Sequence, residues 1–435
     1  MQRHLAFKFE LRKPTGGQQR DMRRFGGSCR FVYNRALSIQ EDNYAKGGKY
    51  ISYASLCKQL TEWRNSEETP WLAESPIHAL QQSLLNLDRA YANYFEDLKK
   101  LKRGEIRPED VRQPTHHKKG RSDSFRYPDP KQFRIDQLNG RVFLPKLGWL
   151  RYSNSREILG APRNITVSSV AAKWFISIQT EREVEQPVHP STSKVGIDMG
   201  IARFATLSDG EIIEAANALK KHRARLTRYQ RMMARRKKVS NNWKKAKAKV
   251  QKVHHRIANV RRDFLHKQST AISKNHATVC VEDLEVRNMS ASAKGTVEDP
   301  GKNVKQKSGL NRSILDQGWA EFRRMLAYKL EWAGGRLVMV SPQYTSQTCL
   351  KCDHVSSGNR KTQARFRCMA CGYEEHADLV GSVNILRSGL RFLEGQDTAG
   401  RSPRRSTKRA RIVRQASGAV MPPATETHRG APCVR

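Results

Sequence analysis

Acidic residues are scarce in this chain of 435 residues. Its 41 Asp and Glu face 81 Lys and Arg, which leaves a formal net charge of +40. A compact protein with this excess repels itself unless a polyanion neutralises the charge. Ribosomes, membrane surfaces and nucleic acids are the partner classes that fit. The length of the chain favours a large enzyme that handles nucleic acid.

Long apolar stretches are missing as well. No run of 18 or more apolar residues occurs, which excludes a helical membrane span, and we expect no membrane partner. The first residues lack the apolar core of a secretory signal, so we expect none. Apolar residues still make up 37% of the chain, enough to exclude wholesale disorder, and the length predicts two to four domains.

Half of the eight cysteines form a pattern. Four are isolated in the sequence: Cys29, Cys57, Cys280 and Cys433. The others form two Cys-x-x-Cys pairs separated by 15 residues, namely Cys349 with Cys352 and Cys368 with Cys371. This spacing is typical of a zinc ribbon, in which four thiolates hold one structural Zn²⁺ ion. Two disulfides or a chance pattern are the alternatives, and a reducing cytosol disfavours the first.

The hydrophobic period predicts a small β-barrel and inserted helices in the first 190 residues. Alternation over 4–11 indicates a half-buried strand, and helical spacing follows over 18–44 and 78–101. Further strands are predicted at 142–144, 165–167 and 174–178. We therefore expect a barrel from 1–15 and 110–190, and a helical domain over 16–109. Residues 186–193 are predicted to form a linker.

A new domain is expected to begin near Lys194. Its predicted elements are strands at 195–197, 204–207, 211–213, 277–281 and 336–340, helices at 317–334 and 378–386, and a polar loop over 289–310. Between them, residues 219–267 carry 19 Lys or Arg and a single acid, Asp263, and predict a helical hairpin. This imbalance favours contact with phosphates over a merely solvated, spacer-like face.

Three carboxylates stand where a nuclease would need them. Asp198 follows an apolar strand between two glycines, Glu282 ends the strand at 277–281, and Asp378 opens the last predicted helix. Hydrolysis of a phosphodiester at neutral pH requires divalent metal ions held by carboxylates, and Mg²⁺ needs few protein ligands. Each acid alone is weak evidence, because Asp378 could simply cap its helix and Asp283 could replace Glu282.

The ordered set of motifs resembles the TnpB proteins of bacterial insertion sequences, relatives of the type V CRISPR effectors. The resemblance rests on the segments 197–200, 281–284 and 342–349, the two cysteine pairs, Asp378, and Asn384 with Ile385. Upstream it includes 27–34, 79–84 and 144–148, so that it covers about residues 1–388. Two positions depart from the family pattern: His376 stands where relatives often have an acid, and Val380 where they often have Asn.

The resemblance implies a multidomain α/β protein with a RuvC-like nuclease domain of the RNase H fold, carrying an inserted zinc ribbon. The small β-barrel with its inserted helical domain would precede it. The nuclease domain would comprise 194–345 and 376–388, the ribbon 346–375, and a basic disordered tail 389–435. In the family, the catalytic acids align with Asp198, Glu282 and Asp378, which decides between Glu282 and Asp283. The zinc ligands align with the four paired cysteines.

The implied function is RNA-guided, metal-dependent cleavage of DNA beside a short adjacent motif. Two Mg²⁺ ions, one Zn²⁺ ion, a guide RNA from the transposon end and double-stranded target DNA are the expected cofactors and partners. We expect a cytoplasmic bacterial protein that joins the nucleoid when bound to DNA. A metal-dependent transposase and a nuclease-inactive RNA-guided repressor are the alternatives. An inserted HNH nuclease is disfavoured, because 282–378 has room for only a loop, a helix, a strand and the ribbon.

Overall fold

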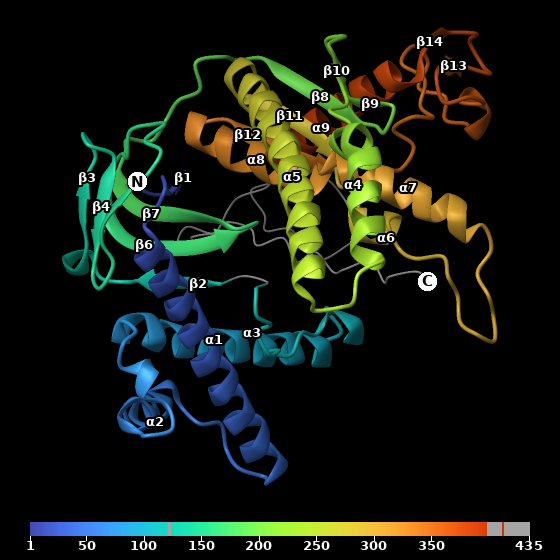
Figure 1. The fold of residues 1–435 in the computed structure, drawn as a ribbon. Helices are drawn as coiled ribbons and strands as arrows, with labels where there is room; N and C mark the ends of the chain where they lie inside the picture. Colours follow the sequence, from blue (N-terminus) through green and yellow to red (C-terminus); the bar gives the residue numbers. More distant parts are fainter. Residues whose placement is uncertain (121–122, 398–410, 413–435) are drawn as a thin grey trace. The chain divides into compact units, whose positions relative to one another are not determined.

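The computed structural model describes residues 1–120, 123–397 and 411–412, which fall into two compact units. The first is Met1–Val184 and the second begins at Glu185. Figure 1 shows the elements of both. None of the helices described is both long enough and apolar enough to cross a membrane.

The strands of the first unit form two antiparallel sheets. Four strands lie in the order β1 (Gln2–Glu10), β7 (Lys173–Glu183), β6 (Ala161–Val170) and β2 (Ser124–Tyr127). Three more lie in the order β3 (Arg134–Asp136), β4 (Arg141–Leu144) and β5 (Gly148–Arg151). A bridge between Leu11 and Tyr152 links the sheets just beyond β1 and β5. Closure of these strands into one barrel stays a prediction.

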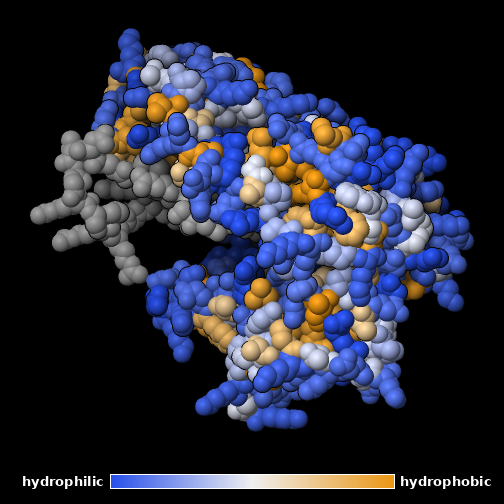
Figure 2. All heavy atoms as spheres, turned by 90° about the vertical axis from the view of Figure 1, so that its left-hand side faces the viewer, coloured by the Kyte–Doolittle hydropathy of each residue, from blue (hydrophilic) through white to orange (hydrophobic). Residues whose placement is uncertain are grey.

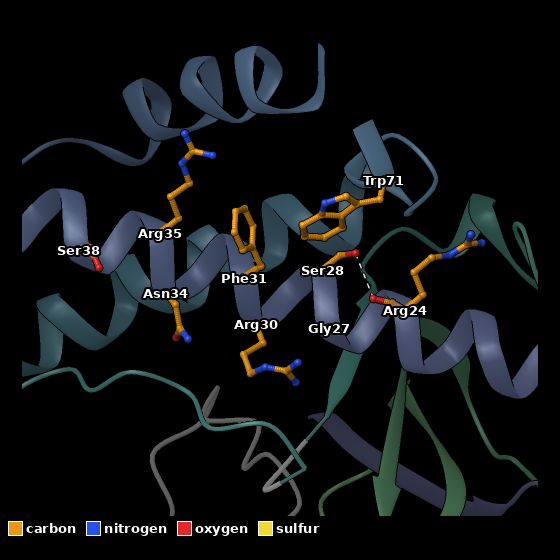
Figure 3. A pocket seen from close by; sticks show the side chains of 9 residues that line it. All are labelled: Arg24, Gly27, Ser28, Arg30, Phe31, Asn34, Arg35, Ser38 and Trp71. Carbon is orange, nitrogen blue, oxygen red and sulfur yellow. Dashed lines mark hydrogen bonds between the residues drawn. The ribbon is translucent and has the colours of Figure 1, made fainter. Parts of the chain in front are cut away.

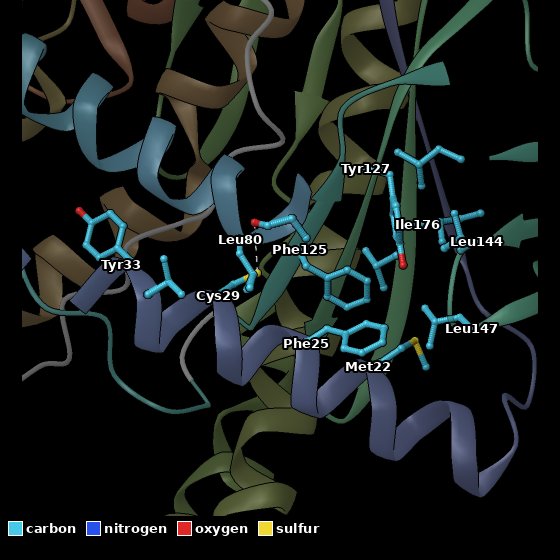
Figure 4. Close-up of a cluster of buried hydrophobic side chains, with 14 of the residues drawn as sticks. Met22, Phe25, Cys29, Tyr33, Leu80, Phe125, Tyr127, Leu144, Leu147 and Ile176 are labelled. Atoms are coloured by element: carbon cyan, nitrogen blue, oxygen red, sulfur yellow. Dashed lines mark hydrogen bonds between the residues drawn. The ribbon is translucent and has the colours of Figure 1, made fainter. Parts of the chain in front are cut away.

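The first unit has three long helices, α1 (Gly16–Ala45), α2 (Tyr53–Asn65) and α3 (Ile77–Lys102). α1 and α3 pack against β2, and α2 packs against α3. α1 begins with a capping box, because the Thr15 hydroxyl accepts a hydrogen bond from the Gln18 backbone N–H while the Gln18 side chain accepts one from Thr15. Phe25 of α1 meets Phe125 of β2 edge to face in a core that the helices share with the strands (Figure 4). The helices and strands of this unit thus contribute to one buried cluster, and the separate helical domain expected over 16–109 stays a prediction.

The second unit is built on a mixed sheet in the order β10-β9-β8-β11-β12-β15. Its strands are β8 (Lys194–Met199), β9 (Arg203–Leu207), β10 (Ile212–Glu214), β11 (Thr278–Glu282), β12 (Arg336–Val340) and β15 (Arg411–Ile412). The first three form an antiparallel meander. β11 runs parallel to β8 and β12 parallel to β11, while β15 pairs antiparallel with β12.

Helices cover both faces of this sheet. Val279 and Val281 face a cluster that includes Leu265 and Phe322, whereas Cys280 between them packs with Ile385. The helices of this unit are α4 (Ala218–Ala234), α5 (Asn241–Asn275), α6 (Val286–Met289), α7 (Val304–Gln317), α8 (Trp319–Ala333) and α9 (Ala377–Asp397), of which α4 packs on α5. The helical hairpin predicted over 219–267 is present as α4 and α5 (Figure 1). A small hairpin of β13 (Arg365–Arg367) and β14 (Glu374–His376) precedes α9.

Two predicted boundaries in the second unit are wrong. The polar segment 289–310 is not all loop, because α7 begins at Val304, where Ile314 and Gln317 become buried further along the helix. The last helix, predicted over 378–386, does not end near Leu386, because α9 continues to Asp397. Gly389 lies directly over Cys280, so this part of α9 packs on the sheet. The remainder of the expected tail lies outside the described residues, apart from β15.

Candidate functional site

The parallel pairing of β8 and β11 sets Asp198 beside Glu282. Val281 is the partner of Ile197 in this ladder, and both acids are the next residues along their strands. Parallel strands keep a constant offset, so the two carboxylates emerge at the same edge of the sheet. The neighbouring Asp283 is differently engaged, because its Oδ1 accepts a hydrogen bond of 3.0 Å from Arg323 of α8.

The third acid arrives on α9, which crosses β8 at very short range. A Cβ atom on Gly196 of β8 would lie 2.1 Å from the carbonyl oxygen of Ser382. A Cβ atom on Gly381 would lie 2.8 Å from Oδ2 of Asp198. Only glycine permits this approach from both sides. It brings the first turn of α9, with Asp378, to the edge where Asp198 and Glu282 emerge.

The three acids influence one another electrostatically. Burial, followed by the charges of Glu282 and Asp378, raises the pKa of Asp198 to about 7. Burial also raises the pKa of Glu282. Within the described part of the chain, no side chain or backbone group donates a hydrogen bond to the Asp198 carboxylate. A partly buried carboxylate without a donor, beside two other acids, is poorly stabilised by the protein itself.

Two side chains that the sequence did not single out contact the acids. Thr345 donates a hydrogen bond of 2.6 Å to Oε1 of Glu282. Arg360, in the segment between the two cysteine pairs, places Nη2 3.3 Å from Oδ1 of Asp378, and its charge lowers the pKa of both Asp198 and Glu282. Sequence spacing gave no signal for Arg360, because it reaches the site through the tertiary position of its loop.

Two further side chains brace this edge of the sheet. Asn384 of α9 donates hydrogen bonds to the carbonyl oxygens of Thr345 and Thr348, which ties α9 to the loop after β12. His376 accepts a hydrogen bond from the Asp378 backbone N–H at Nδ1, while its Nε2 lies 3.2 Å from Arg203. Val380, the other departure from the family pattern, is fully buried among apolar side chains.

The four paired cysteines form a cluster that could hold a metal ion. Their sulfur atoms all lie within 4.8 Å of one another, with 3.6 Å between Cys349 and Cys371 and 3.5 Å between Cys352 and Cys368. A disulfide would need about 2.05 Å, whereas a tetrahedral zinc site with Zn–S bonds of about 2.3 Å has sulfurs about 3.8 Å apart. The backbone N–H of Cys371 helps lower the pKa of Cys368 to about 6, which favours a thiolate. The three acids do not form so tight a cluster in the described chain.

The face of α4 carries a strongly cationic hollow of about 1120 Å³. The charged residues that line it are Lys220, Arg223, Arg228, Arg231, Arg235 and Arg236. Their side chains have no acidic partner among the described residues. Asp316 of α7 caps α4 by accepting hydrogen bonds from the Leu219 backbone N–H. Figure 2 shows hydrophilic side chains over much of the molecular face that it presents.

A second hollow, of about 560 Å³, lies along α1 of the first unit (Figure 3). Arg24, Arg30 and Arg35 line it beside Phe31 and Trp71. These guanidinium groups already have partners within the protein. Arg24 pairs with Asp21 and Glu74, Arg30 pairs with Asp123, and Arg35 lies over the rings of Phe31 and Trp63. The hollow is therefore charge-balanced, in contrast to the one on α4.

Comparisons with known proteins agree with this architecture. Three family models match: one described as a probable transposase over residues 177–293, a Cas12f1-like TNB domain over 319–385, and a helix-turn-helix domain over 1–49. The chain is 54% identical over 389 residues to the putative RNA-guided DNA endonuclease InsQ of Escherichia coli K12, covering 89% of this chain and 93% of that protein.

A second relative and one solved structure extend the comparison. A putative RNA-guided DNA endonuclease of Streptomyces pristinaespiralis is 34% identical over 390 residues, which is 88% of this chain and 89% of that protein. The cryo-EM structure of a Cas12f1–sgRNA–target DNA complex matches with a TM-score of 0.51 at 15% identity, covering 85% of this chain and 82% of that one. At this identity the match establishes a shared fold.

Proposed function

From the premise that this chain belongs to the TnpB family of RNA-guided DNA endonucleases of insertion sequences, we propose that it cuts DNA at the edge of the second unit's sheet. Asp198, Glu282 and Asp378 are the catalytic acids. The observation that carries this assignment is the meeting of three acids that are far apart in sequence: Glu282 and Asp378 lie close enough to the partly buried Asp198 to raise its pKa.

The nuclease domain is of the RuvC type, with the RNase H fold. Two features support this. An antiparallel meander, β10-β9-β8, continues into the parallel strands β11 and β12. Asp198 lies near the end of β8 and Glu282 ends β11, while Asp378 lies at the start of α9, which packs on the sheet. Adjacent parallel strands and a covering helix give three rigid attachment points, which suits a site that must hold its ligands in fixed geometry.

The three acids fit Mg²⁺ by their chemistry. They supply hard oxygen ligands. Burial and then repulsion from Glu282 and Asp378 raise the pKa of Asp198, and a bound cation would relieve the repulsion. Two Mg²⁺ ions, when bound, supply an activated water and stabilise the departing oxygen of the phosphodiester. Thr345 holds Glu282 in orientation, and Arg360 holds Asp378 while it reduces the negative potential around the other two acids. Gly381 leaves room for the Asp198 carboxylate.

The thiol cluster is a structural zinc site. The near-tetrahedral sulfur spacing supports Zn²⁺, and a closed four-thiolate shell leaves no coordination position for chemistry. Its role here is to fold the segment that carries Arg360. Binding Zn²⁺ at Cys349, Cys352, Cys368 and Cys371 orders the loop between the two pairs, and that loop presents the guanidinium to Asp378.

The cationic face of α4 contacts nucleic-acid backbone. Its cations lack acidic partners and follow no base-reading pattern, so phosphates of the guide RNA or of its duplex with target DNA are the suitable ligands. The sequence of the target would be read by base pairing with the guide, and the protein would read a short motif beside it. A protein with this activity works in the bacterial cytoplasm, on the nucleoid.

The test is cleavage by the full chain, loaded with the guide RNA that co-purifies with it, on DNA that contains the guide's complement. We expect Asp198→Ala and Glu282→Gln to abolish cleavage while target binding persists, because affinity comes mainly from cations. The matched control is Asp283→Asn, which changes the adjacent acid that faces Arg323 and should still cut. Cleavage by Glu282→Gln at the wild-type rate would overturn the assignment.

The same assay separates two other activities. A transposase, the description attached to one matching family model, would join cut ends to a new strand. A strand-transfer product with no requirement for guide RNA would favour it. A nuclease-inactive repressor would bind the target without cutting it. The presence of all three acids, and the electrostatic coupling among them, argues against this alternative.

A further inference from the structure

The outer face of the three-stranded sheet in the first unit carries arginine and aromatic side chains. Strand alternation sends Val142, Leu144 and Leu150 into the core. The register places Arg134 opposite Phe143 and Phe143 opposite Trp149, so these three form one row across the other face.

The contacts in this row form a continuous stack. The guanidinium of Arg134 lies 4.9 Å from the ring centre of Phe143, and Phe143 meets Trp149 at 5.7 Å and 67°. Arg141 lies 4.7 Å from the Trp149 ring. We call these four residues, Arg134, Phe143, Trp149 and Arg141, the arginine–aromatic ladder. Trp149 is nonetheless 42% exposed. A tryptophan held only for packing would be expected to bury more of its ring.

The backbone beneath the ladder is held firmly. The side-chain amide of Gln18, already part of the α1 capping box, donates hydrogen bonds of 3.0 Å to the carbonyl oxygens of both Leu147 and Trp149. The exposed ring therefore stands on a fixed strand and not on a loose loop. An aromatic platform fixed in this way loses little conformational entropy when a planar ligand stacks on it.

The charge of this face selects the ligand. Its three strands contain one acid, Asp136, which pairs with Arg141 at 2.7 Å. No acid among the described residues pairs with Arg134 or with the exposed Arg151, which lie on the same face. Exposed aromatic rings flanked by cations match single-stranded nucleic acid, in which unpaired bases stack on the rings and phosphates meet the cations.

We propose that the arginine–aromatic ladder binds unpaired bases of the guide RNA. The proposal rests on the RNA-guided function above and adds a surface outside the nuclease site. RNA is the occupant because its unpaired loops are open to stacking at every stage, whereas target DNA is paired with its complement or with the guide, except for the displaced strand. A base stacked on Trp149 would tie the guide to the first unit.

The experiment is photo-crosslinking of the full chain to its co-purified guide RNA carrying 5-iodouridine, followed by mapping of the crosslinked peptides. We expect crosslinks on peptides that contain Phe143 or Trp149. Crosslinks confined to other peptides would overturn the proposal. Crosslinks from these rings to the displaced DNA strand, with none to the RNA, would overturn the choice of occupant.

Affinity measurements give an independent readout. Trp149→Ala should weaken binding of an unstructured RNA oligonucleotide by about tenfold, since one stacked base contributes roughly 1–3 kcal/mol. It should leave unchanged the binding of an abasic strand of equal length and charge. Trp149→Phe should restore most of the loss. Trp332→Ala, which removes a tryptophan that is 37% exposed on α8, is the matched control and should bind both strands normally.

Two outcomes separate this proposal from the function on which it rests. A wild-type chain that retains no RNA and cuts no DNA would contradict the proposed function itself. The ladder alone would be contradicted if the wild-type chain retains RNA and cuts DNA, while Trp149→Ala loses affinity equally for the RNA oligonucleotide and the abasic strand, or for neither. Arg151→Gln guards against a folding defect, because the exposed Arg151 side chain makes no hydrogen bond or ion pair with the described residues. It should weaken binding of the RNA oligonucleotide and of the abasic strand to the same extent.

Discussion

Replacing Asp198 by Asn should stabilise the protein at neutral and alkaline pH. Its pKa rises from the ordinary value of 3.8 to about 7 in the folded chain, so the folded state holds the proton more tightly than the unfolded state. A raised carboxyl pKa makes stability fall as pH rises through this window. At 1.36 kcal/mol per pKa unit, the penalty is about 2 kcal/mol near pH 5 and about 4 kcal/mol near pH 8.

Asparagine removes this penalty and gives up no hydrogen bond that the described structure shows. In urea unfolding of the metal-free full chain, the variant should have the larger free energy of unfolding. Its lead over the wild type should grow by about 2 kcal/mol between these two pH values. Added Mg²⁺ should stabilise the wild type more than the variant. The control is Asp263→Asn, an exposed acid on α5 that pairs with Lys267. A wild type as stable as the variant at alkaline pH would refute the argument that burial and the neighbouring acids disfavour the charged form of Asp198.

The remaining predictions concern other parts of the second unit. Cys368→Ser should remove about one tightly bound zinc ion per chain, measured by elemental analysis, because three thiolates no longer close the shell. Gln at all four positions 235–238 should weaken binding to unrelated nucleic acids equally and lower the slope of log affinity against log salt by roughly one per lost contact. Gly381→Ala should abolish cleavage but spare target binding, because its Cβ would displace the Asp198 carboxylate. Arg360→Gln should move the acidic limb of the pH–rate profile to higher pH, because the guanidinium lowers the pKa of Asp198.

Each of these changes has a control or a contradicting result. Gly395→Ala lies on the same helix as Gly381 with no atom near the new Cβ, and it should leave cleavage intact. Arg360→Lys should restore the pH profile in part, since it keeps the charge. Fully active protein without zinc would count against the structural metal. A salt slope unchanged by the substitutions at 235–238 would mean that the hairpin is only a charged spacer.

Hydrophobic period predicted the elements that bury one clear face. The hairpin of α4 and α5 and the strands β8, β9, β11 and β12 all have such a pattern. α2 was missed although Leu56, Leu60 and Trp63 recur at helical spacing, so its signal was present in the sequence. α7 gave little signal, because much of it is polar and its buried side chains lie near its end.

The residues of the candidate site also fall into two groups, those that the sequence identifies and those that only the fold identifies. The acids could be named from sequence because each follows or opens an element with a recognisable pattern. Their meeting depends on the register of β8 with β11 and on the glycine contact between β8 and α9, which are tertiary facts. Arg360 and Thr345 lie in loops without a periodic pattern, and only the folded position of those loops reveals their contacts with the acids. Local sequence carries no record of such distances.

The dependence of the site on α9 also orders events during synthesis. Asp198 emerges 180 residues before Asp378, and translation at about 5–20 residues per second separates the two by roughly 10–40 seconds. Until α9 docks on β8, the nascent chain has only two of the three proposed catalytic acids in place and cannot form the complete proposed centre. The first unit and the cationic hairpin are already synthesised by then. A growing chain can thus acquire its RNA before it is able to cut.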